Sequence, residues 1–272
     1  MSTITIDQVD YHYESSIQDL SQVTFVFLHG FLGSKRDFEK IVGDFSEQYL
    51  VLDLLGFGEN KDQNIEPDRF IQKNQVEDLE DIFSKLNLVN INLVGYSMGG
   101  RLAIAYALKY PKRINSLFLE STTAGISDQQ QRLDRQNHDK KLAHSVIDQG
   151  MDKFIENWEK LPLFSSQQAV SKNDFTFMHQ QRIDQNPINV ANSLLEMGTG
   201  KQPNYWPDVG QLSKLSVKII VGSKDSKFIK IGHRLHELIH GSTLTVVSNS
   251  GHNVHFETPI EYKKILLNNL LK

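Results

Sequence analysis

The sequence INLVGYSMGG occupies residues 91–100 of this 272-residue chain. Its first four residues form an apolar run typical of a buried strand, and a helical pattern begins at Met98. Between them, Gly95 to Gly99 match the G-x-S-x-G pattern, in which a sharp strand-to-helix turn exposes a serine. The helix N-terminus favours negative charge that develops beside it. This context predicts that Ser97 does catalytic chemistry; the alternative is a glycine-rich turn that merely holds a serine.

Similar apolar runs recur along the chain, and they are typical of strands buried on both faces of a parallel sheet. They are Val23–Leu28, Tyr49–Leu52, Ile91–Val94, Ile114–Leu119, Val217–Val221 and Leu244–Val247. Helical patterns separate most of them, at Asp68–Leu86, Met98–Lys109, Phe228–Ile239 and Pro259–Leu271. Residues 3–13 alternate apolar and polar, which predicts an antiparallel arm. The alternation of strands and helices predicts an α/β fold with a doubly wound sheet.

The strand–helix alternation stops at about residue 122 and resumes at about residue 209. The intervening segment is rich in Gln, Asp, Asn and Lys, and its apolar residues recur at helical spacing. It contains large aromatic residues that need burial, among them Phe154, Trp158, Phe164, Phe175 and Phe177. We therefore expect residues 122–208 to form a helical cap inserted into a core made of residues 1–121 and 209–272.

Two further polar residues follow predicted core strands. Asp225 comes just after Val217–Val221, and His252 comes just after Leu244–Val247. The chain order of Ser97, the aspartate and the histidine is the one found in Ser-Asp-His triads on doubly wound sheets. A buried aspartate fixes the histidine tautomer, which makes the serine a usable base or nucleophile at neutral pH. We predict a catalytic triad of Ser97, His252 and Asp225.

The loop after the first core strand reads HGF at residues 29–31. In such folds this loop supplies one donor of an oxyanion hole, and the residue after the nucleophile supplies the other. We expect these donors to be the backbone N–H groups of Phe31 and Met98. His29 is interpreted as a structural histidine beneath the loop, and Asp53 as structural too. His255, the nearest rival of the proposed catalytic histidine, is expected to point elsewhere.

The bulk composition excludes several classes of function. Hydrophobic residues make up 39% and charged residues 23%, which is typical of a globular protein. A net charge of -4 gives no electrostatic case for binding nucleic acid or an anionic membrane. The absence of cysteine excludes disulfides, thiolate catalysis and zinc–thiolate sites. With no signal-peptide pattern and no apolar run near the ~18 residues of a spanning helix, we expect a soluble cytoplasmic protein.

With these residues in view, the chain resembles the α/β-hydrolase superfamily over nearly its whole length. It is more closely similar to one branch, the 2-succinyl-6-hydroxy-2,4-cyclohexadiene-1-carboxylate (SHCHC) synthases of menaquinone biosynthesis. The matching stretches are GYSMGGR at 95–101, GSKDSKF at 222–228 and GHNVH at 251–255, followed by Glu257 and Pro259, and in the cap Arg132, Arg135, Trp158, PLF at 162–164 and Arg182. Leu55 and Phe57 depart from the proline and histidine common in the superfamily, and both are expected to lie outside the chemistry.

The resemblance implies an eight-stranded, mostly parallel sheet and a cofactor-independent, metal-free lyase. In that family pyruvate is eliminated from a small-molecule polycarboxylate, 2-succinyl-5-enolpyruvyl-6-hydroxy-3-cyclohexene-1-carboxylate. The resemblance also implies that Ser97, activated by His252 and Asp225, removes a proton alpha to the succinyl carbonyl. Arginine binds carboxylates through two parallel hydrogen bonds. The substrate-binding residues implied are Arg101, Arg135, Arg182, Tyr96, Trp158 and Lys227.

Two other functions use the same residues differently. A carboxylesterase, thioesterase or C–C bond hydrolase would employ Ser97 as a nucleophile on a carbonyl. An apolar pocket would favour that hydrolase, and convergent arginines count against it. A non-catalytic ligand-binding protein can also keep this fold, although an intact triad argues against it.

Overall fold

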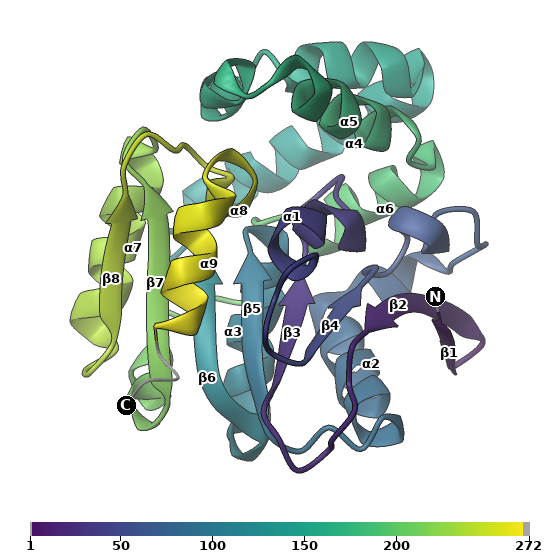
Figure 1. Cartoon of the computed structure of the whole chain (residues 1–272). Helices are drawn as coiled ribbons and strands as arrows, with labels where there is room; N and C mark the ends of the chain where they lie inside the picture. Colours follow the sequence, from purple (N-terminus) through teal and green to yellow (C-terminus); the bar gives the residue numbers. More distant parts are fainter. Residues whose placement is uncertain (1, 269–272) are drawn as a thin grey trace.

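The computed structural model describes residues 2–268, which contain one eight-stranded sheet. The strands are β1 (Ser2–Ile6), β2 (Val9–Ser15), β3 (Thr24–Leu28), β4 (Tyr49–Leu52), β5 (Ile91–Tyr96), β6 (Ile114–Glu120), β7 (Ser216–Gly222) and β8 (Thr243–Val247). They lie in the order β1-β2-β4-β3-β5-β6-β7-β8 (Figure 1). The hairpin of β1 and β2 joins β4 antiparallel, and every other neighbouring pair is parallel. The expected α/β fold with a mostly parallel eight-stranded sheet is confirmed.

Helices cover both faces of the sheet because its central strands bury side chains on both faces. Successive side chains of a strand point to opposite sides. On β3, Phe25 and Phe27 therefore join one apolar cluster, and Val26 and Leu28 join the other. The first cluster includes residues of α1 (Glu39–Val42), α8 (Val254–Glu257) and α9 (Pro259–Leu267), and the second includes residues of α2 (Gln72–Lys85), α3 (Met98–Lys109) and α7 (Ser226–Leu238).

One expected helix starts later than the sequence pattern indicates. The helix expected over Asp68–Leu86 begins at Gln72. Before it, Pro67–Phe70 form a 3-10 turn, and Ile71 is extended with a ψ of 130°. The extended backbone of Ile71 interrupts the helix. The apolar periodicity of the sequence runs across this interruption, which is why it predicted too early a start.

The last strand and the last helix also differ from expectation. The strand expected to be buried on both faces at Leu244–Val247 is instead the edge strand β8, and Val246 is 43% exposed. An edge strand has a neighbour on one side only, which leaves part of it open to solvent. The helix expected over Pro259–Leu271 is seen as α9, and residues 269–271 of that prediction lie outside the described residues.

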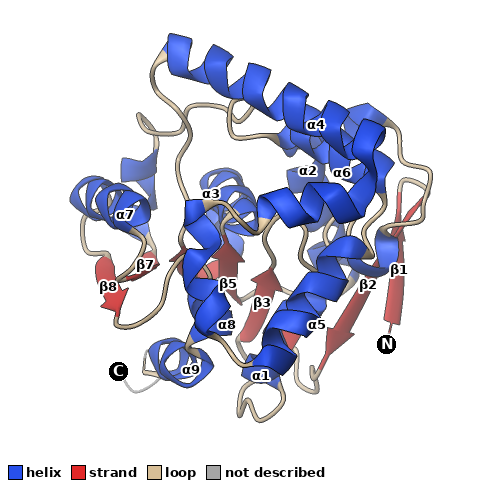
Figure 2. Cartoon of the chain, turned by 90° about the horizontal axis from the view of Figure 1, so that it is seen from above, coloured by secondary structure: helices blue, strands red, loops and turns tan. Residues whose placement is uncertain are grey.

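A helical insertion separates β6 from β7. It contains α4 (Gln129–Trp158), the 3-10 helix η5 (Pro162–Ala169), α5 (Lys172–Ile183) and α6 (Pro187–Met197). These helices lie above the carboxyl ends of the strands, and α4 is broken at Gly150, whose φ is 79° (Figures 1 and 2). The insertion is confirmed, while cap boundaries at 122 and 208 stay a prediction. Within residues 2–268, no helix combines the length and apolar character needed to cross a membrane.

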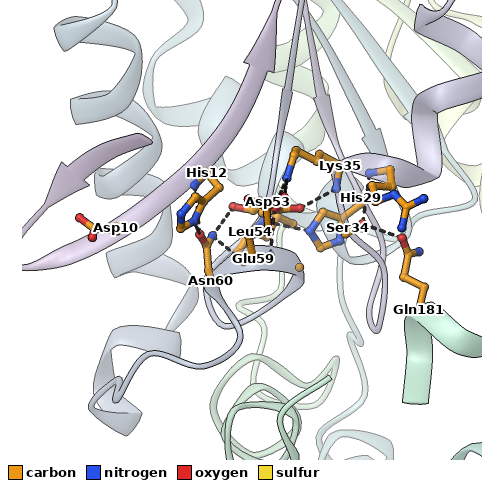
Figure 3. Close-up of polar contacts among 12 residues, drawn as sticks. Asp10, His12, His29, Ser34, Lys35, Asp53, Leu54, Glu59, Asn60 and Gln181 are labelled. Atoms are coloured by element: carbon orange, nitrogen blue, oxygen red, sulfur yellow. Dashed lines mark hydrogen bonds and ion pairs between the residues drawn. The ribbon is translucent and has the colours of Figure 1, made fainter. Parts of the chain in front are cut away.

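A buried ion pair anchors the loop that follows β3 (Figure 3). The ammonium of Lys35 donates to Asp53 Oδ2 at 2.8 Å and to Glu59 Oε1 at 2.7 Å. The backbone N–H of Lys35 donates to the other oxygen of Asp53, at 2.7 Å. Burial opposes the charge of Lys35, but Asp53 and Glu59 raise the pKa of its ammonium above the usual value. Asp53 is fully buried, in agreement with the structural role expected of it.

Replacing Lys35 with methionine should destabilise the protein by about 3–5 kcal/mol, because it leaves the Asp53 carboxylate buried without its cation. The matched control is Arg36→Met. That neighbouring side chain is 54% exposed and pairs with Glu39 at the surface, so its loss should cost about 1 kcal/mol or less. Urea unfolding of both variants measures the difference. Equal losses would show that the buried pair does not anchor the loop.

Candidate active site

The turn between β5 and α3 holds Ser97 in a strained conformation. Its φ is 49° and its ψ is -102°, a region that residues with a side chain rarely adopt. The Ser97 N–H donates to the Glu120 carbonyl oxygen at 2.9 Å. The Thr122 hydroxyl donates to the Ser97 carbonyl oxygen at 2.8 Å. Bonds on both sides of the residue hold the strained turn in place.

Two glycines of the turn are required by close backbone contacts. A Cβ added at Gly95 would lie 2.6 Å from Gly100 Cα, and one added at Gly99 would lie 2.2 Å from the Leu28 carbonyl oxygen. The Gly99 N–H donates to the His29 carbonyl oxygen at 3.0 Å. The start of α3 therefore packs directly on the end of β3 and on the loop that carries Phe31.

The structure brings Ser97, His252 and Asp225 into one hydrogen-bonded chain. His252 Nδ1 lies 2.8 Å from Asp225 Oδ2, and His252 Nε2 lies 3.1 Å from Ser97 Oγ. A buried carboxylate beside Nδ1 favours the tautomer with its proton there, which leaves Nε2 free to accept from the serine hydroxyl. Asp225 is fixed as the N-cap of α7 by accepting the Phe228 N–H at 3.1 Å. These hydrogen bonds can carry a proton from the Ser97 hydroxyl to His252.

His255 takes no part in that chain. Its Nδ1 lies 2.8 Å from Glu120 Oε2, and its ring stacks on Phe38 with centroids 4.6 Å apart. Both members of the pair are fully buried, and neither lines the cavity beside Ser97. The rival histidine thus points into the core, as the sequence analysis expected.

His29 supports the loop that carries the expected oxyanion-hole donor Phe31. Its Nε2 accepts the Leu54 N–H at 2.9 Å, and its Nδ1 lies 2.7 Å from the Gly30 carbonyl oxygen (Figure 3). Only the neutral ring with a proton on Nδ1 satisfies both contacts. Desolvation in the core lowers the pKa of His29, which favours that neutral form.

Phe57 supports the same loop from outside the cavity. It does not line the cavity, in agreement with the expectation that it lies outside the chemistry, and its ring packs edge-on against His29 and Phe31, with centroid distances of 5.9 and 5.7 Å. A second support comes from the cap. The amide of Gln181, on α5, accepts from the Ser34 hydroxyl at 2.6 Å and donates to Asp37. Core and cap together therefore hold the loop.

A cavity of about 570 Å³ lies between the core and the cap, beside the proposed triad. Every residue predicted to contact substrate lines it, together with Ser97, His252 and both expected oxyanion donors: Phe31, Tyr96, Met98, Arg101, Arg135, Trp158, Arg182 and Lys227. Asp225 is not in the lining and contacts the ring of His252 instead. Within residues 2–268, no three histidine or acidic side chains are placed to hold a metal ion.

Arg101, Arg135 and Lys227 form a cluster of positive charge in the cavity wall. Arg101 is 8% exposed, and desolvation, with a further contribution from Arg135, lowers the pKa of its guanidinium to about 10. It donates to the Met197 carbonyl oxygen at 2.7 Å, and no carboxylate of residues 2–268 lies within ion-pair distance of it. Desolvation and the nearby charge of Arg135 lower the pKa of Lys227. Such a cluster favours a ligand with more than one negative charge.

Arg135 and Arg182 differ from Arg101 because each already has an acidic partner. Arg135 Nε donates to the buried Asp139 at 2.8 Å, so its two terminal nitrogens keep their donors for another partner. Arg182 donates from one terminal nitrogen to Glu159 and from the other to Gln167, both at 2.9 Å. Arg182 is therefore the arginine held most firmly by the cap, and its contact with substrate stays a prediction.

The two predicted aromatic residues line the cavity, and Trp158 connects the cap with the core. Trp158, at the end of α4, lies 5.3 Å from the Phe31 ring and 5.4 Å from the Phe164 ring, measured between centroids. The Tyr96 ring lies 5.5 Å from that of His252, and burial raises the pKa of its hydroxyl well above the ordinary value. The Tyr96 hydroxyl thus stays protonated, and both rings shape the apolar wall of the cavity.

The polar residues of the cavity wall that sequence reasoning missed include Asp37, Gln131, Gln181 and Arg234. The two glutamines lie in a glutamine-rich segment, where nothing local separates a wall residue from a solvated one. For Arg234, its spacing from Lys227 in the sequence could have predicted a place in the cavity wall. Arg234 follows Lys227 by seven residues on a helix, and that spacing puts both on one face.

Comparison with known proteins shows the family and the fold of this chain. A family model described as the alpha/beta hydrolase fold matches residues 23–259. A Bacillus subtilis (strain 168) protein with the provisional name SHCHC synthase is 39% identical over 242 residues, which are 89% of this chain and 88% of that protein. The solved structure of MenH from S. aureus has a TM-score of 0.88 and 33% identity, and the match covers 96% of this chain and 97% of that one.

A more distant structural neighbour shows how widely the fold is shared. A thermophilic esterase from Thermogutta terrifontis has a TM-score of 0.83 at 22% identity, over 98% of this chain and 96% of its own. At that identity the likeness concerns the fold alone. The similarity to SHCHC synthases expected from the sequence is confirmed, and the chemistry has to be argued from the cavity.

The neutral state of His29 predicts a pH dependence of stability. Its pKa is lower in the folded protein than the value of about 6.5 expected unfolded, so the unfolded chain binds more protons as the pH falls. The free energy of unfolding should therefore decrease below pH ~6.5, by up to about 1.4 kcal/mol per pH unit from this group. Urea unfolding between pH 7.5 and 5 measures it.

The matched variants are His29→Gln and His240→Gln. Removing the buried ring should lower stability and flatten the pH dependence, whereas removing the exposed histidine should change neither. An undiminished pH dependence in His29→Gln would assign the titration to another group.

Proposed function

This chain belongs to the α/β-hydrolase fold family, and on that premise we propose that it is a pyruvate-eliminating lyase. Its substrate is 2-succinyl-5-enolpyruvyl-6-hydroxy-3-cyclohexene-1-carboxylate, and its product is the SHCHC of menaquinone biosynthesis. The similarity in sequence and structure to proteins that carry the SHCHC synthase and MenH names supports this choice within the family.

The observation that carries the proposal is the cluster of Arg101, Arg135 and Lys227 beside Ser97. Arg101 is buried and forms no ion pair among the described residues, and the charge of Asp139 only partly offsets the burial that lowers its pKa, so a ligand with negative charge would stabilise it. The substrate carries three carboxylates, which suit such a cluster. A hydrolase for neutral esters would gain nothing from it, whereas a lyase for a tricarboxylate requires it for orientation.

The reaction begins with transfer of the Ser97 hydroxyl proton to His252 Nε2, across the 3.1 Å contact. The serine oxygen takes the ring proton alpha to the succinyl carbonyl. The electron pair of the broken C–H bond first passes to the succinyl carbonyl oxygen, which gives a dienolate. When the dienolate collapses, the carbonyl forms again, a new ring double bond appears, the existing ring double bond shifts by one position, and the bond between the ring carbon and the enolpyruvyl oxygen breaks. The protonated His252 returns a proton to the leaving enolpyruvate, which becomes pyruvate. Asp225 stabilises the charged imidazole throughout.

The succinyl carbonyl oxygen becomes negative when the proton leaves. In the proposal, the backbone N–H groups of Phe31 and Met98 bind that oxygen in the dienolate. The strained turn at Ser97 and the supports beneath Phe31 hold both donors in place before the substrate arrives. Preorganised donors of this kind stabilise the charge without rearranging during the reaction.

The test is pyruvate release from the enzymatically prepared enolpyruvyl substrate. Ser97→Ala should slow it by about 10²–10⁴-fold, because proton abstraction loses its base. Arg101→Ala should raise KM by about tenfold or more, because a charge-assisted bond to a carboxylate is lost. Lys140→Ala removes an exposed cation of α4 that does not line the cavity, and it should behave like the wild type.

Hydrolysis of p-nitrophenyl acetate is measured in parallel. Fast pyruvate release that depends on Ser97 would support the lyase. Absence of pyruvate together with brisk, Ser97-dependent ester cleavage would overturn the proposal and make the protein a serine hydrolase.

A further inference from the structure

One wall of the cavity is formed by a stripe of residues on α7. Lys227, Ile231 and Arg234 all line the cavity, at positions i, i+4 and i+7 of the helix. That spacing places them on a single face. The stripe starts beside the positive cluster around Arg101 and ends at Arg234, which is exposed at the mouth of the cavity.

Arg234 is held in a fixed position by an aromatic ring. Its guanidinium carbon lies 3.8 Å from the centroid of Trp206. Trp206 is 7% exposed, and its indole N–H donates to the Gly125 carbonyl oxygen at 2.8 Å. A guanidinium stacked on a fixed ring keeps its planar edge available for hydrogen bonds. The arginine is therefore a prepared donor and not a freely rotating surface cation.

The charges around Arg234 leave it available for a ligand. Its Nη2 contacts the Ser127 hydroxyl at 3.4 Å, and no acidic residue of the described chain pairs with it. Asp128 lines the same wall, but its Oδ1 accepts the Gln131 N–H at 2.8 Å as the cap of α4. The N-terminus of that helix is therefore already capped by the Asp128 carboxylate, and Arg234 is a cation of this wall without an ion-pair partner among the described residues.

We propose that Arg234 and the Ser127 hydroxyl form an outer carboxylate subsite at the solvent-exposed end of the α7 stripe. The subsite is separate from the inner cluster of Arg101, Arg135 and Lys227. It binds the carboxylate of the substrate that lies farthest from the inner cluster, so that a polycarboxylate is held at both ends while Ser97 acts between them. The identity of that substrate rests on the proposed function; the preference for a carboxylate rests on the wall itself.

Steady-state pyruvate release tests the subsite with a matched pair on α7. Arg234→Gln should raise KM by about tenfold and change kcat by less than about twofold, because the lost contact is far from the reacting carbon. Lys230→Gln removes an exposed cation from the same helix outside the cavity lining, and its KM should match the wild type. Arg234→Lys keeps the charge but loses the planar edge, and should fall between them.

A binding measurement makes the subsite testable even if the proposed reaction fails. The probe is tricarballylate (propane-1,2,3-tricarboxylate), titrated by isothermal calorimetry into the wild type, Arg234→Gln and Lys230→Gln. About tenfold weaker binding to Arg234→Gln alone supports the subsite. That result without any pyruvate release would retain the subsite and reject the lyase. Identical KM and identical probe affinity in Arg234→Gln and Lys230→Gln would overturn the subsite.

Discussion

The contact between the start of α3 and the end of β3 is the constraint on which the site depends. The Gly99 N–H binds the His29 carbonyl oxygen at 3.0 Å, and there is no room for a side chain between Gly99 and Leu28. This contact joins the loop that exposes Ser97 to the loop that carries Phe31. The proposed base and the proposed oxyanion donors are therefore positioned as one unit, and a shift of one loop would move the other.

Beneath these two loops, each buried polar side chain has a partner that compensates for its loss of contact with water. His29 remains neutral because both ring nitrogens already have backbone partners. Lys35 and Asp53 are buried as a pair, since either one alone would be an uncompensated charge. The polar groups under the loop thus satisfy one another, and Ser97 and His252 line the cavity beside it.

The positive charge of the cavity is balanced unevenly. Asp139 and Glu159 neutralise Arg135 and Arg182 from within the cap. These pairs let the helices of the cap pack without a ligand, because an unpaired buried guanidinium would oppose folding. Arg101 forms no ion pair among the described residues, and the charge of Asp139 offsets only part of the effect of burial on its pKa. A carboxylate of the proposed substrate would therefore stabilise the charge of Arg101.

The success of prediction from sequence depended on how local each signal is. Ser97 could be placed because strand, turn and helix follow one another within ten residues, and α3 begins and ends where its periodicity predicts. The acidic partner of Arg182 could not be found, because Glu159 lies 23 residues away on another helix. The support that Phe57 gives to Phe31 was missed for the same reason, since it arises between two loops.

The proton relay alone does not decide the reaction. A serine bonded to a histidine can attack a carbonyl or remove a proton, and the two reactions need the same donors and the same acid. The difference lies in which atom the cavity places against Ser97 Oγ. Charged residues that fix a polycarboxylate at several points leave the ring little freedom to turn, so the position of the cations selects the atom that reacts. On this argument the chemistry is set by the cations of α3, the cap and α7, and the loops at the ends of the strands supply only the relay.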